Sequence, residues 1–260
     1  MSEPKPLASA YDLPYRVRYS APRPFSSGIP LTLRISAKRE TADAVEEYAT
    51  VVTAFAMLAA TGALSGDRLP PEEAAGLECD QPLDHVAEWR LSGARLDDRA
   101  LVVLAQLLTA SHETHPIAEI TCVADGGSAS ATLVCDPTLD DPYPPSIAGI
   151  PFTAILDPEL EGDATISIDF ARMLTPEEGE AVDAWIMAWA AVTMSGAYGV
   201  APVPPADCGI SCAEEVILFD DSLELPITAA RAHPACWNGL VNACVALHAL
   251  LVPIRELRIE

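Results

Sequence analysis

Cys208 and Cys212 lie in one loop and have the chemistry of a metal or redox site. Structural zinc is usually held by a pair of cysteines with two to four residues between them and by two further ligands. His233 and Cys236 could complete such a set, but nothing in their spacing requires it. The C-x₃-C spacing also differs from the C-x-x-C of thioredoxin-like motifs. We therefore interpret the cysteines as structural thiols and expect neither a metal nor another cofactor.

The segment SHETHP places His112, Glu113 and His115 just before a proline. A zinc-binding helix of the H-E-x-x-H type needs histidines four residues apart on one face, and here they are three apart. The segment lies where a helix is expected to end, and positive charge is favoured at a helix C-terminus. We interpret these histidines as helix-end residues and predict no metal site here.

Adjacent pairs of acidic residues recur along the chain. They are Asp140 with Asp141, Glu214 with Glu215, and Asp220 with Asp221. Neighbouring residues on a strand point to opposite faces, so such pairs are poor catalytic dyads. The sequence also contains no Gly-rich phosphate loop and no G-x-S-x-G motif. We predict no catalytic residues and favour a protein that is not an enzyme. We interpret these pairs as solvated surface charge, with an acidic docking face as the functional alternative.

The chain is strongly acidic, with 38 Asp and Glu against 15 Lys and Arg and a net charge of −23. Affinity for nucleic acid comes from Lys and Arg on phosphate, so the composition disfavours nucleic-acid partners. An acidic surface instead suits a basic protein partner. The charge is uneven: residues 124–164 contain acids but no base.

The charge-free run from Ala184 to Ala206 is interrupted by glycines and prolines, so we predict a buried helix and no membrane partner. The N-terminal residues lack the apolar segment of a secretory signal. The chain has seven cysteines, an odd number that suits buried reduced thiols better than a disulfide framework. These observations predict a cytoplasmic protein.

Two halves of the sequence share the same order of elements. When Thr41 is aligned with Thr175 without a gap, Gly62 meets Gly196, and the prolines at 70–71 meet those at 204–205. The segment HPIAEITC near the end of the first half matches VPIRELRI at the end of the second. Because self-similarity of this kind indicates repeated structural units, we predict an internal duplication covering roughly 31–123 and 165–259.

Each half is predicted to be a β-α-β-α-β unit, because alternating segments are followed by longer apolar ones. The predicted strands of the units are Leu31–Ile35, Val86–Leu91 and Ile117–Val123, then Thr165–Phe170, Val216–Phe219 and Ile254–Ile259. The helices should end at Gly62, span Asp97–Glu113, run from Thr175 to Gly196, and span Pro234–Leu251. Flanking strands are expected at Tyr15–Ser20, at Ala129–Cys135 in a hairpin with Ile117–Val123, and at Phe152–Leu156.

The fold class that follows is α+β (mixed α/β), with two sheets related by a pseudo-twofold axis and helices packed between or against them. We divide the chain into an N-terminal arm with one strand (1–30), a first repeat (31–136), an acidic Pro-rich linker with an edge strand (137–163) and a second repeat (164–260). The first long helix of each half is almost free of charge, so we expect the two to pack together. The alternative is that they form the interface of a homodimer.

The segment VAEWRLSGARLDDRALVVLAQLL, followed by HPIAEITC, resembles a single leucine-rich repeat of the ribonuclease-inhibitor type. The second half contains a weaker version of it. A solenoid needs about three or more stacked repeats, so this family is not assigned to the chain. The resemblance implies only that the second and third strands of each half are parallel neighbours joined by a helix.

The sequence favours a non-enzymatic protein that binds a basic protein partner, as inhibitor or immunity-type proteins do. The alternative is an enzyme or small-molecule binder with its site where the two halves meet, for which Trp89, His85, Cys208 and His233 are the residues to consider. The full set of candidate binding residues is Trp89, His85, Cys208, Cys212, His233, Glu214, Asp220 and Asp221.

Overall fold

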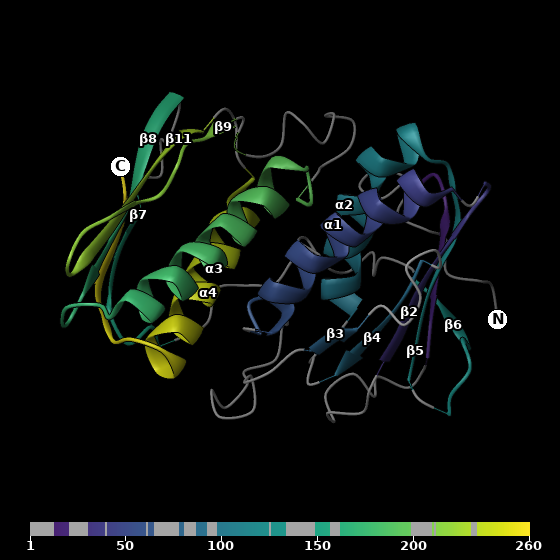
Figure 1. The fold of residues 1–260 in the computed structure, drawn as a ribbon, viewed down its shortest axis with the longest axis horizontal. Coiled ribbons are helices and arrows are strands. Elements are labelled where there is room, and N and C mark those ends of the chain that lie inside the picture. The colour runs from purple at the N-terminus through teal and green to yellow at the C-terminus, as the bar shows by residue number, and fades with distance from the viewer. Residues whose placement is uncertain are drawn as a thin grey trace.

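The computed structural model describes residues 13–20, 31–39, 41–60, 62–64, 78–80, 87–92, 98–124, 126–133, 149–156, 162–198, 210, 212–229 and 233–260. In these residues two β-sheets lie on opposite sides of the molecule, and the helices occupy the space between them (Figure 1). The fold class is therefore α+β, as the sequence predicts. No helix in the described part of the chain is long and apolar enough to span a membrane.

Sheet A and two helices come from the first half of the chain. The sheet has the order β3-β4-β2-β5-β1-β6. Its strands are β1 (Arg16–Tyr19), β2 (Leu31–Ala37), β3 (Glu78–Asp80), β4 (Glu88–Ser92), β5 (Ile117–Ala124) and β6 (Ala131–Thr132), and the helices are α1 (Ala42–Ala60) and α2 (Asp98–Thr114).

Sheet B and the other two helices come from the second half. The sheet has the order β10-β11-β8-β12-β7, and β9 also pairs with β11. Its strands are β7 (Thr153–Leu156), β8 (Gly162–Phe170), β9 (Cys212–Ala213), β10 (Ile217–Leu218), β11 (Ser222–Ala229) and β12 (Ile254–Ile259), and the helices are α3 (Pro176–Met194) and α4 (Pro234–Leu250).

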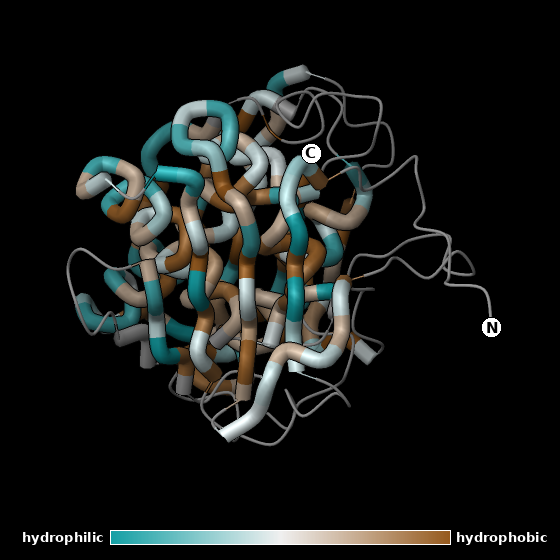
Figure 2. The backbone as a smooth tube through the Cα atoms, turned by 90° about the vertical axis from the view of Figure 1, so that its right-hand side faces the viewer, coloured by the Kyte–Doolittle hydropathy of each residue, from teal (hydrophilic) through white to brown (hydrophobic). Residues whose placement is uncertain are grey.

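Alternation of residue types gives each sheet one buried and one outward face. In β2, Leu31, Leu33 and Ile35 are buried while the residues between them are not, and β8 repeats this pattern up to Phe170. Figure 2 looks onto sheet A from outside, and hydrophilic and hydrophobic residues alternate along its strands. The apolar face of each sheet therefore packs on the helices, which makes the core, and the polar face meets solvent.

The two sheets pair their strands in the same way. In sheet A, β2 lies between β4 and β5 and is antiparallel to both, while β1 is parallel to β5. In sheet B, β8 lies between β11 and β12 and is antiparallel to both, while β7 is parallel to β12. Both central pairs also shift register at one end, next to Ala37 in sheet A and Ile254 in sheet B. Five pairs of strands thus occupy corresponding positions: β1 and β7, β2 and β8, β3 and β9, β4 and β11, and β5 and β12.

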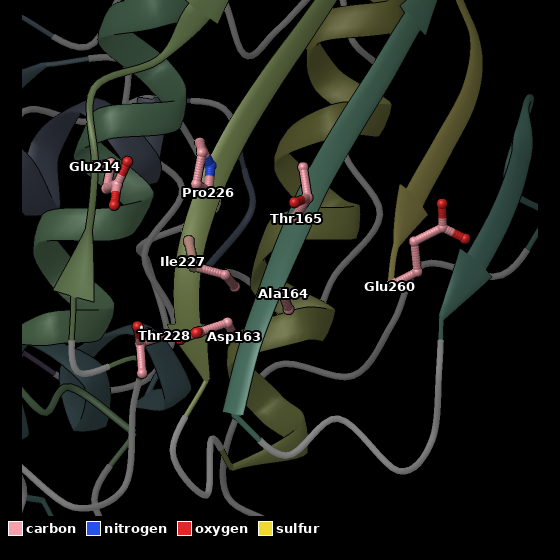
Figure 3. Close-up of a pocket in the computed structure, with 8 residues that line it drawn as sticks. All are labelled: Asp163, Ala164, Thr165, Glu214, Pro226, Ile227, Thr228 and Glu260. Atoms are coloured by element: carbon pink, nitrogen blue, oxygen red, sulfur yellow. Dashed lines mark hydrogen bonds between the residues drawn. The ribbon is translucent and has the colours of Figure 1, made fainter.

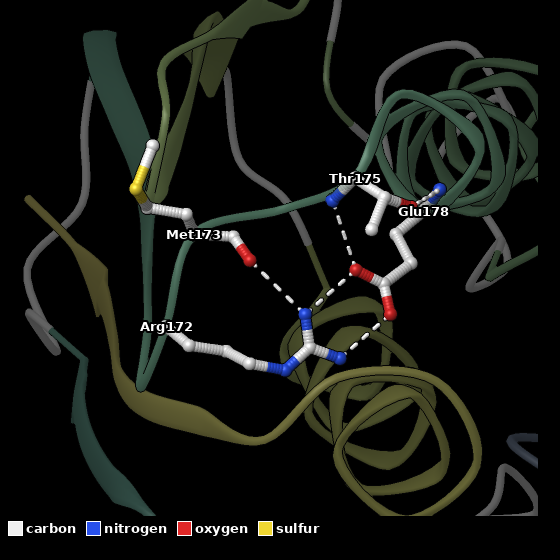
Figure 4. Close-up of polar contacts among 4 residues, drawn as sticks. All are labelled: Arg172, Met173, Thr175 and Glu178. Carbon is white, nitrogen blue, oxygen red and sulfur yellow. Dashed lines mark hydrogen bonds and ion pairs between the residues drawn. The ribbon is translucent and has the colours of Figure 1, made fainter.

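The predicted start of α3 is confirmed. Thr175 accepts a hydrogen bond from the Glu178 backbone N–H at 3.3 Å, and the Glu178 carboxylate accepts one from the Thr175 N–H at 3.0 Å (Figure 4). This capping box uses two N–H groups that a helix start leaves without intrahelical partners. Arg172 adds two hydrogen bonds to Glu178, at 2.8 and 2.6 Å.

The long helices end where the sequence predicts. Gly62 follows α1 with φ 72°, and Gly196 follows α3 with φ 78°. Backbone in this left-handed region favours glycine, which explains why both helices stop at this residue type.

Helices α1 and α3 pack against each other at the centre of the molecule, as the charge-free segments predict (Figure 1). Val52 and Phe55 of α1 and Ile186 and Trp189 of α3 are all completely buried. These apolar surfaces are therefore occupied within one chain, and a homodimer would need another surface.

Three strand predictions need correction. Ala131–Thr132 pairs with β1 and not with Ile117–Val123, because β1 inserts beside β5 in parallel. The strands on either side of the second helix in each half are not neighbours, since β2 separates β4 from β5 and β8 separates β11 from β12. The implication taken from the leucine-rich repeat is therefore wrong.

The third correction concerns Val216–Phe219. Within this segment only Ile217–Leu218 forms a strand, β10, which is the outer strand of a hairpin. The strand that lies beside β8 is β11. The sequence of β11 is not typical of a strand because it contains Pro226, and proline is disfavoured inside a sheet. The proline is tolerated because its partner across the strands, Thr165, exchanges both backbone hydrogen bonds with Glu260 on the other side.

Candidate functional site

Carboxylates dominate the outward face of sheet B. They belong to Asp163, Asp169, Glu214, Glu224, Glu256 and Glu260, and the basic residues on this face are Arg255 and Arg258. Arg258 contacts Glu256 and lies 3.8 Å from Glu260, and Arg255 lies 4.0 Å from Asp169. Asp163 and Glu214 make no ion pair within the described residues, so part of the face keeps uncompensated negative charge.

A hollow of about 340 Å³ opens at one end of this face (Figure 3). It is lined by Asp163, Ala164, Thr165, Glu214, Pro226, Ile227, Thr228 and Glu260. Its carboxylates come from three elements: the start of β8, the residue after β9 and the residue after β12. Pairing of these strands with their neighbours brings residues far apart in the sequence to one site.

Backbone and side-chain hydrogen bonds hold the walls of the hollow in place. Thr228 donates a hydrogen bond from Oγ1 to Asp163 Oδ1 at 3.0 Å. Glu214 donates its backbone N–H to the Pro226 carbonyl at 3.1 Å, which fixes the chain after β9 against β11. The side chains of Asp163 and Glu214 stay exposed. The arrangement presents acceptor oxygens, which suit Lys, Arg or a positively charged ligand.

A helix carboxyl lies near one of the residues that follow β9. Asp183 on α3 has a raised pKa, first because it is partly buried and second because the Glu215 carboxylate lies nearby. Burial and like charge both disfavour the ionised form. The Glu215 carboxylate is thus close enough to α3 to contribute to this shift of the Asp183 pKa.

Among the side chains that the structure describes, the outer face of sheet A carries more bases than acids. It carries Arg16, Arg18, Arg34 and Arg90 together with Glu88 and Glu119. Arg18 lies 4.0 Å from Glu119 and donates a hydrogen bond to the Ala129 carbonyl at 2.8 Å. The two outward faces of this chain therefore differ in charge although their strands are paired alike.

The predicted site residues that the structure describes lie in separate places. Trp89 is 2 % exposed and faces the core opposite Leu33, so packing explains it. His85 and Cys208 lie outside the described residues, as does the side chain of Cys212. The backbone of Cys212 belongs to β9 and pairs with Thr228 of β11.

The remaining candidates are structural or exposed. His233 is the N-cap of α4 and accepts a hydrogen bond from the Ala235 N–H at 3.2 Å. Asp220 and Asp221 are exposed in the turn between β10 and β11. The Asp221 carbonyl accepts a hydrogen bond from the N–H of Phe170, the last residue of β8, and the Asp220 carbonyl accepts one from the N–H of Leu174. Among the predicted residues that the structure describes, Glu214 is the one that lines the hollow.

His112 has a structural role that reappears in the second half. Its Nδ1 accepts a hydrogen bond from the Ile117 N–H at 3.0 Å, and its ring lies 5.4 Å from that of Tyr15. His248 accepts one from the Ile254 N–H at 2.9 Å, and its ring lies 5.9 Å from that of Phe152. Each histidine thus closes the corner between a helix and the strand that follows it.

His115 lies 3.3 Å from Glu47, and no group of three potential ligands in the described chain could hold a metal ion. The thiols of Cys122 and Cys244 are fully buried, and burial raises the pKa of each to about 12. Thiols in this state are poor nucleophiles, since the reactive form is the thiolate. Burial therefore gives Cys122 and Cys244 a structural role.

Sequence reasoning missed Asp163, Thr228 and Glu260 as members of the site. The available signal was the excess of acids in residues 124–164, which includes Asp163. No protein-family model, no curated protein and no solved structure matches this chain.

Proposed function

We propose that this protein acts by binding, and that the acidic outer face of sheet B takes a basic segment of another protein, as in inhibitor or immunity-type proteins. The observation that carries the proposal is the hollow with three carboxylates, from Asp163, Glu214 and Glu260, supplied by three strands. Charge of one sign on a concave surface steers an oppositely charged partner and fixes its position. Nucleic acid is a poor partner for this face, because phosphate is repelled by it.

A catalytic function has less support. The junction between the halves is filled by α1 and α3, and Asn242 donates a hydrogen bond there to the Ala63 carbonyl at 3.3 Å. Of the residues considered for an active site at that junction, the structure describes Trp89 and His233, which are a core residue and a helix cap. Binding therefore remains the function that the geometry favours.

The proposal includes an origin by internal duplication. Support comes from the corresponding strand pairings and from the matched contacts of His112 and His248. In this account one copy kept a mixed outer face and the other became the acidic binding face. A reducing, cytoplasmic location is part of the same proposal, supported by buried free thiols at Cys122, Cys236 and Cys244.

The experiment is a binding titration with a blocked eight-residue peptide that alternates lysine with threonine or valine. The test variant combines Asp163→Asn, Glu214→Gln and Glu260→Gln. The control combines Asp43→Asn, Glu46→Gln and Glu113→Gln, which removes the same charge from exposed helix positions. We expect the test variant to bind about tenfold or more weakly, and the control to bind within about twofold of the wild type. Equal weakening by both variants would show that only net charge matters and would overturn the proposal.

A further inference from the structure

The outer edges of the two sheets differ where their strands correspond. In sheet A, β6 covers the edge of β1: the Ser130 N–H donates to the Tyr19 carbonyl at 3.1 Å, and the Leu133 N–H donates to the Val17 carbonyl at 2.8 Å. In sheet B, β7 holds the position of β1 and is the last strand of the sheet. No described residue pairs with the free edge of β7.

The pairing of β1 identifies which backbone groups of β7 face that edge. In β1, Val17 and Tyr19 bond towards β6, whereas the next residue, Ser20, donates its N–H to β5. Successive residues of a strand point their backbone groups to opposite sides. Val17 pairs with Ile120 of β5, and Ala154 of β7 pairs with Leu257 of β12 at the corresponding position. The N–H and C=O groups of Ala154 and Leu156 therefore point to the free edge.

The side chains of β7 do not include the residue types that usually prevent a sheet edge from pairing with another strand. The strand reads Thr-Ala-Ile-Leu, with no charged residue, and Ile155 and Leu156 are 43 % and 42 % exposed. Proteins commonly guard such edges with charged residues or proline, because unpaired N–H and C=O groups otherwise invite another strand. Here the strand lacks both, so its edge can accept one.

Charge decides which strand fits. On the neighbouring strand, Arg258 pairs across from Ile155 and is shared by two carboxylates, Glu256 and Glu260. The sequence continues from β7 with three more acids and no base, Asp157, Glu159 and Glu161, so acids outnumber bases next to this edge. A second copy would bring the same acidic residues to this edge and be repelled. A strand bearing Lys or Arg would be attracted.

We propose that the free edge of β7 accepts an extended strand of a basic partner protein, antiparallel to β7 as β6 is to β1. This inference rests on the proposed function and specifies how the partner of the acidic face is held. Main-chain hydrogen bonds at Ala154 and Leu156 would supply affinity, and the neighbouring carboxylates would supply selectivity, which is the division of roles in β-strand addition.

The test uses the same lysine-containing peptide with an Ala154→Pro variant of the full chain. Proline removes the N–H that points to the free edge and leaves the bonds to β12, since Ala154 does not direct its N–H to that strand. Ala154→Val, which keeps the N–H and favours the extended backbone, is the matched control. We expect binding about tenfold weaker for the proline variant and unchanged within about twofold for valine.

Two further peptides test strand character and charge. The first has proline at its centre, and the second has glutamate in place of lysine; both should bind more weakly than the original. If the proline variant does not fold, exchange of the Ala154 and Leu156 amide hydrogens in the wild type replaces it. Both amides should exchange more slowly when the lysine-containing peptide is added.

The outcomes separate this inference from the proposed function. Wild-type affinity in a folded Ala154→Pro variant, or unchanged amide exchange, would overturn strand addition, while sensitivity to the carboxylate variant would leave the acidic binding face in place. Insensitivity to both variants would overturn both proposals. Dimerisation of the wild type in sedimentation velocity that Ala154→Pro abolishes would show that a second copy takes the edge, and would also overturn the inference.

Discussion

Sheets A and B pair their strands alike but present different outer faces. Inward residues at matching positions, such as Leu33 and Ile166, are apolar in both sheets and fix the register against the helices. Outward residues are free of that constraint: Arg34 of β2 corresponds to Ser167 of β8, and Arg18 of β1 corresponds to Ile155 of β7. Packing thus determines the fold, while charge on the solvent side is available for function.

The two sheets also differ at the edges of their corresponding strands β1 and β7. The first half covers its parallel edge strand with β6, and the second half leaves the corresponding strand open within the described residues. A covered edge is inert towards other chains, whereas an open apolar edge is a template for pairing. This difference is the reason why we propose binding at the second half.

The largest expected effect tests whether corresponding core positions are equivalent. Trp89 and Leu225 are both fully buried and occupy matching places beside β2 and β8. We expect Trp89→Ala to lower the free energy of unfolding by about 3–5 kcal/mol and Leu225→Ala by about 2–5 kcal/mol, because each leaves a cavity. Urea denaturation measures both. A loss below about 1 kcal/mol for Trp89→Ala would contradict its core role.

A smaller effect tests the matched corners. His112→Ala and His248→Ala each remove the acceptor for one backbone N–H, of Ile117 and Ile254 respectively. Each should cost about 1–3 kcal/mol, and the two costs should be similar, because the local contacts correspond. Denaturation curves of the two single variants give the comparison. A large cost in one half and none in the other would argue against equivalent roles.

The smallest effect concerns a feature found only at the start of α3. The hydrogen bond from Arg172, followed by that from the Thr175 backbone, lowers the pKa of Glu178 from 4.5 to about 2. Because the folded state holds the ionised form, this stabilisation is present above about pH 4.5 and is lost as the pH falls towards 2.

Glu178→Gln removes this pH dependence, and Glu177→Gln, in the same helical turn, serves as its control. Thermal unfolding at pH 6 and pH 3 should show a smaller loss on acidification for Glu178→Gln than for the wild type. The same loss in both proteins would exclude a contribution from the Arg172–Glu178 pair.

Most elements were predictable because their signals are local. Alternation located β8 and β12, Thr175 and Glu178 marked the start of α3, and the glycines at 62 and 196 marked helix ends. The pairing of strands was not predictable, since neighbours such as β1 and β5 are distant in sequence. Strand β11 was not predicted because it contains Pro226. A proline is tolerated there only because the backbone groups of Thr165, the residue opposite, bond to Glu260, and this pairing cannot be read from the local sequence.

The site was less predictable than the fold. Of its residues only Glu214 was identified, because adjacent acids draw attention in a sequence whereas Asp163 and Glu260 are single residues from separate strands. Trp89 and His233 attracted interest through residue type, and burial and helix capping account for them. A binding face assembled across a sheet leaves no contiguous motif.

The most direct test of the binding face is amide chemical-shift mapping of the labelled full chain during titration with the lysine-containing peptide. The account predicts changes concentrated in β7, β8 and β11 of sheet B, with Ala154 and Leu156 among the most affected amides, and no change in β2 or β4 of sheet A. Changes centred on sheet A, or spread evenly over both faces, would contradict it.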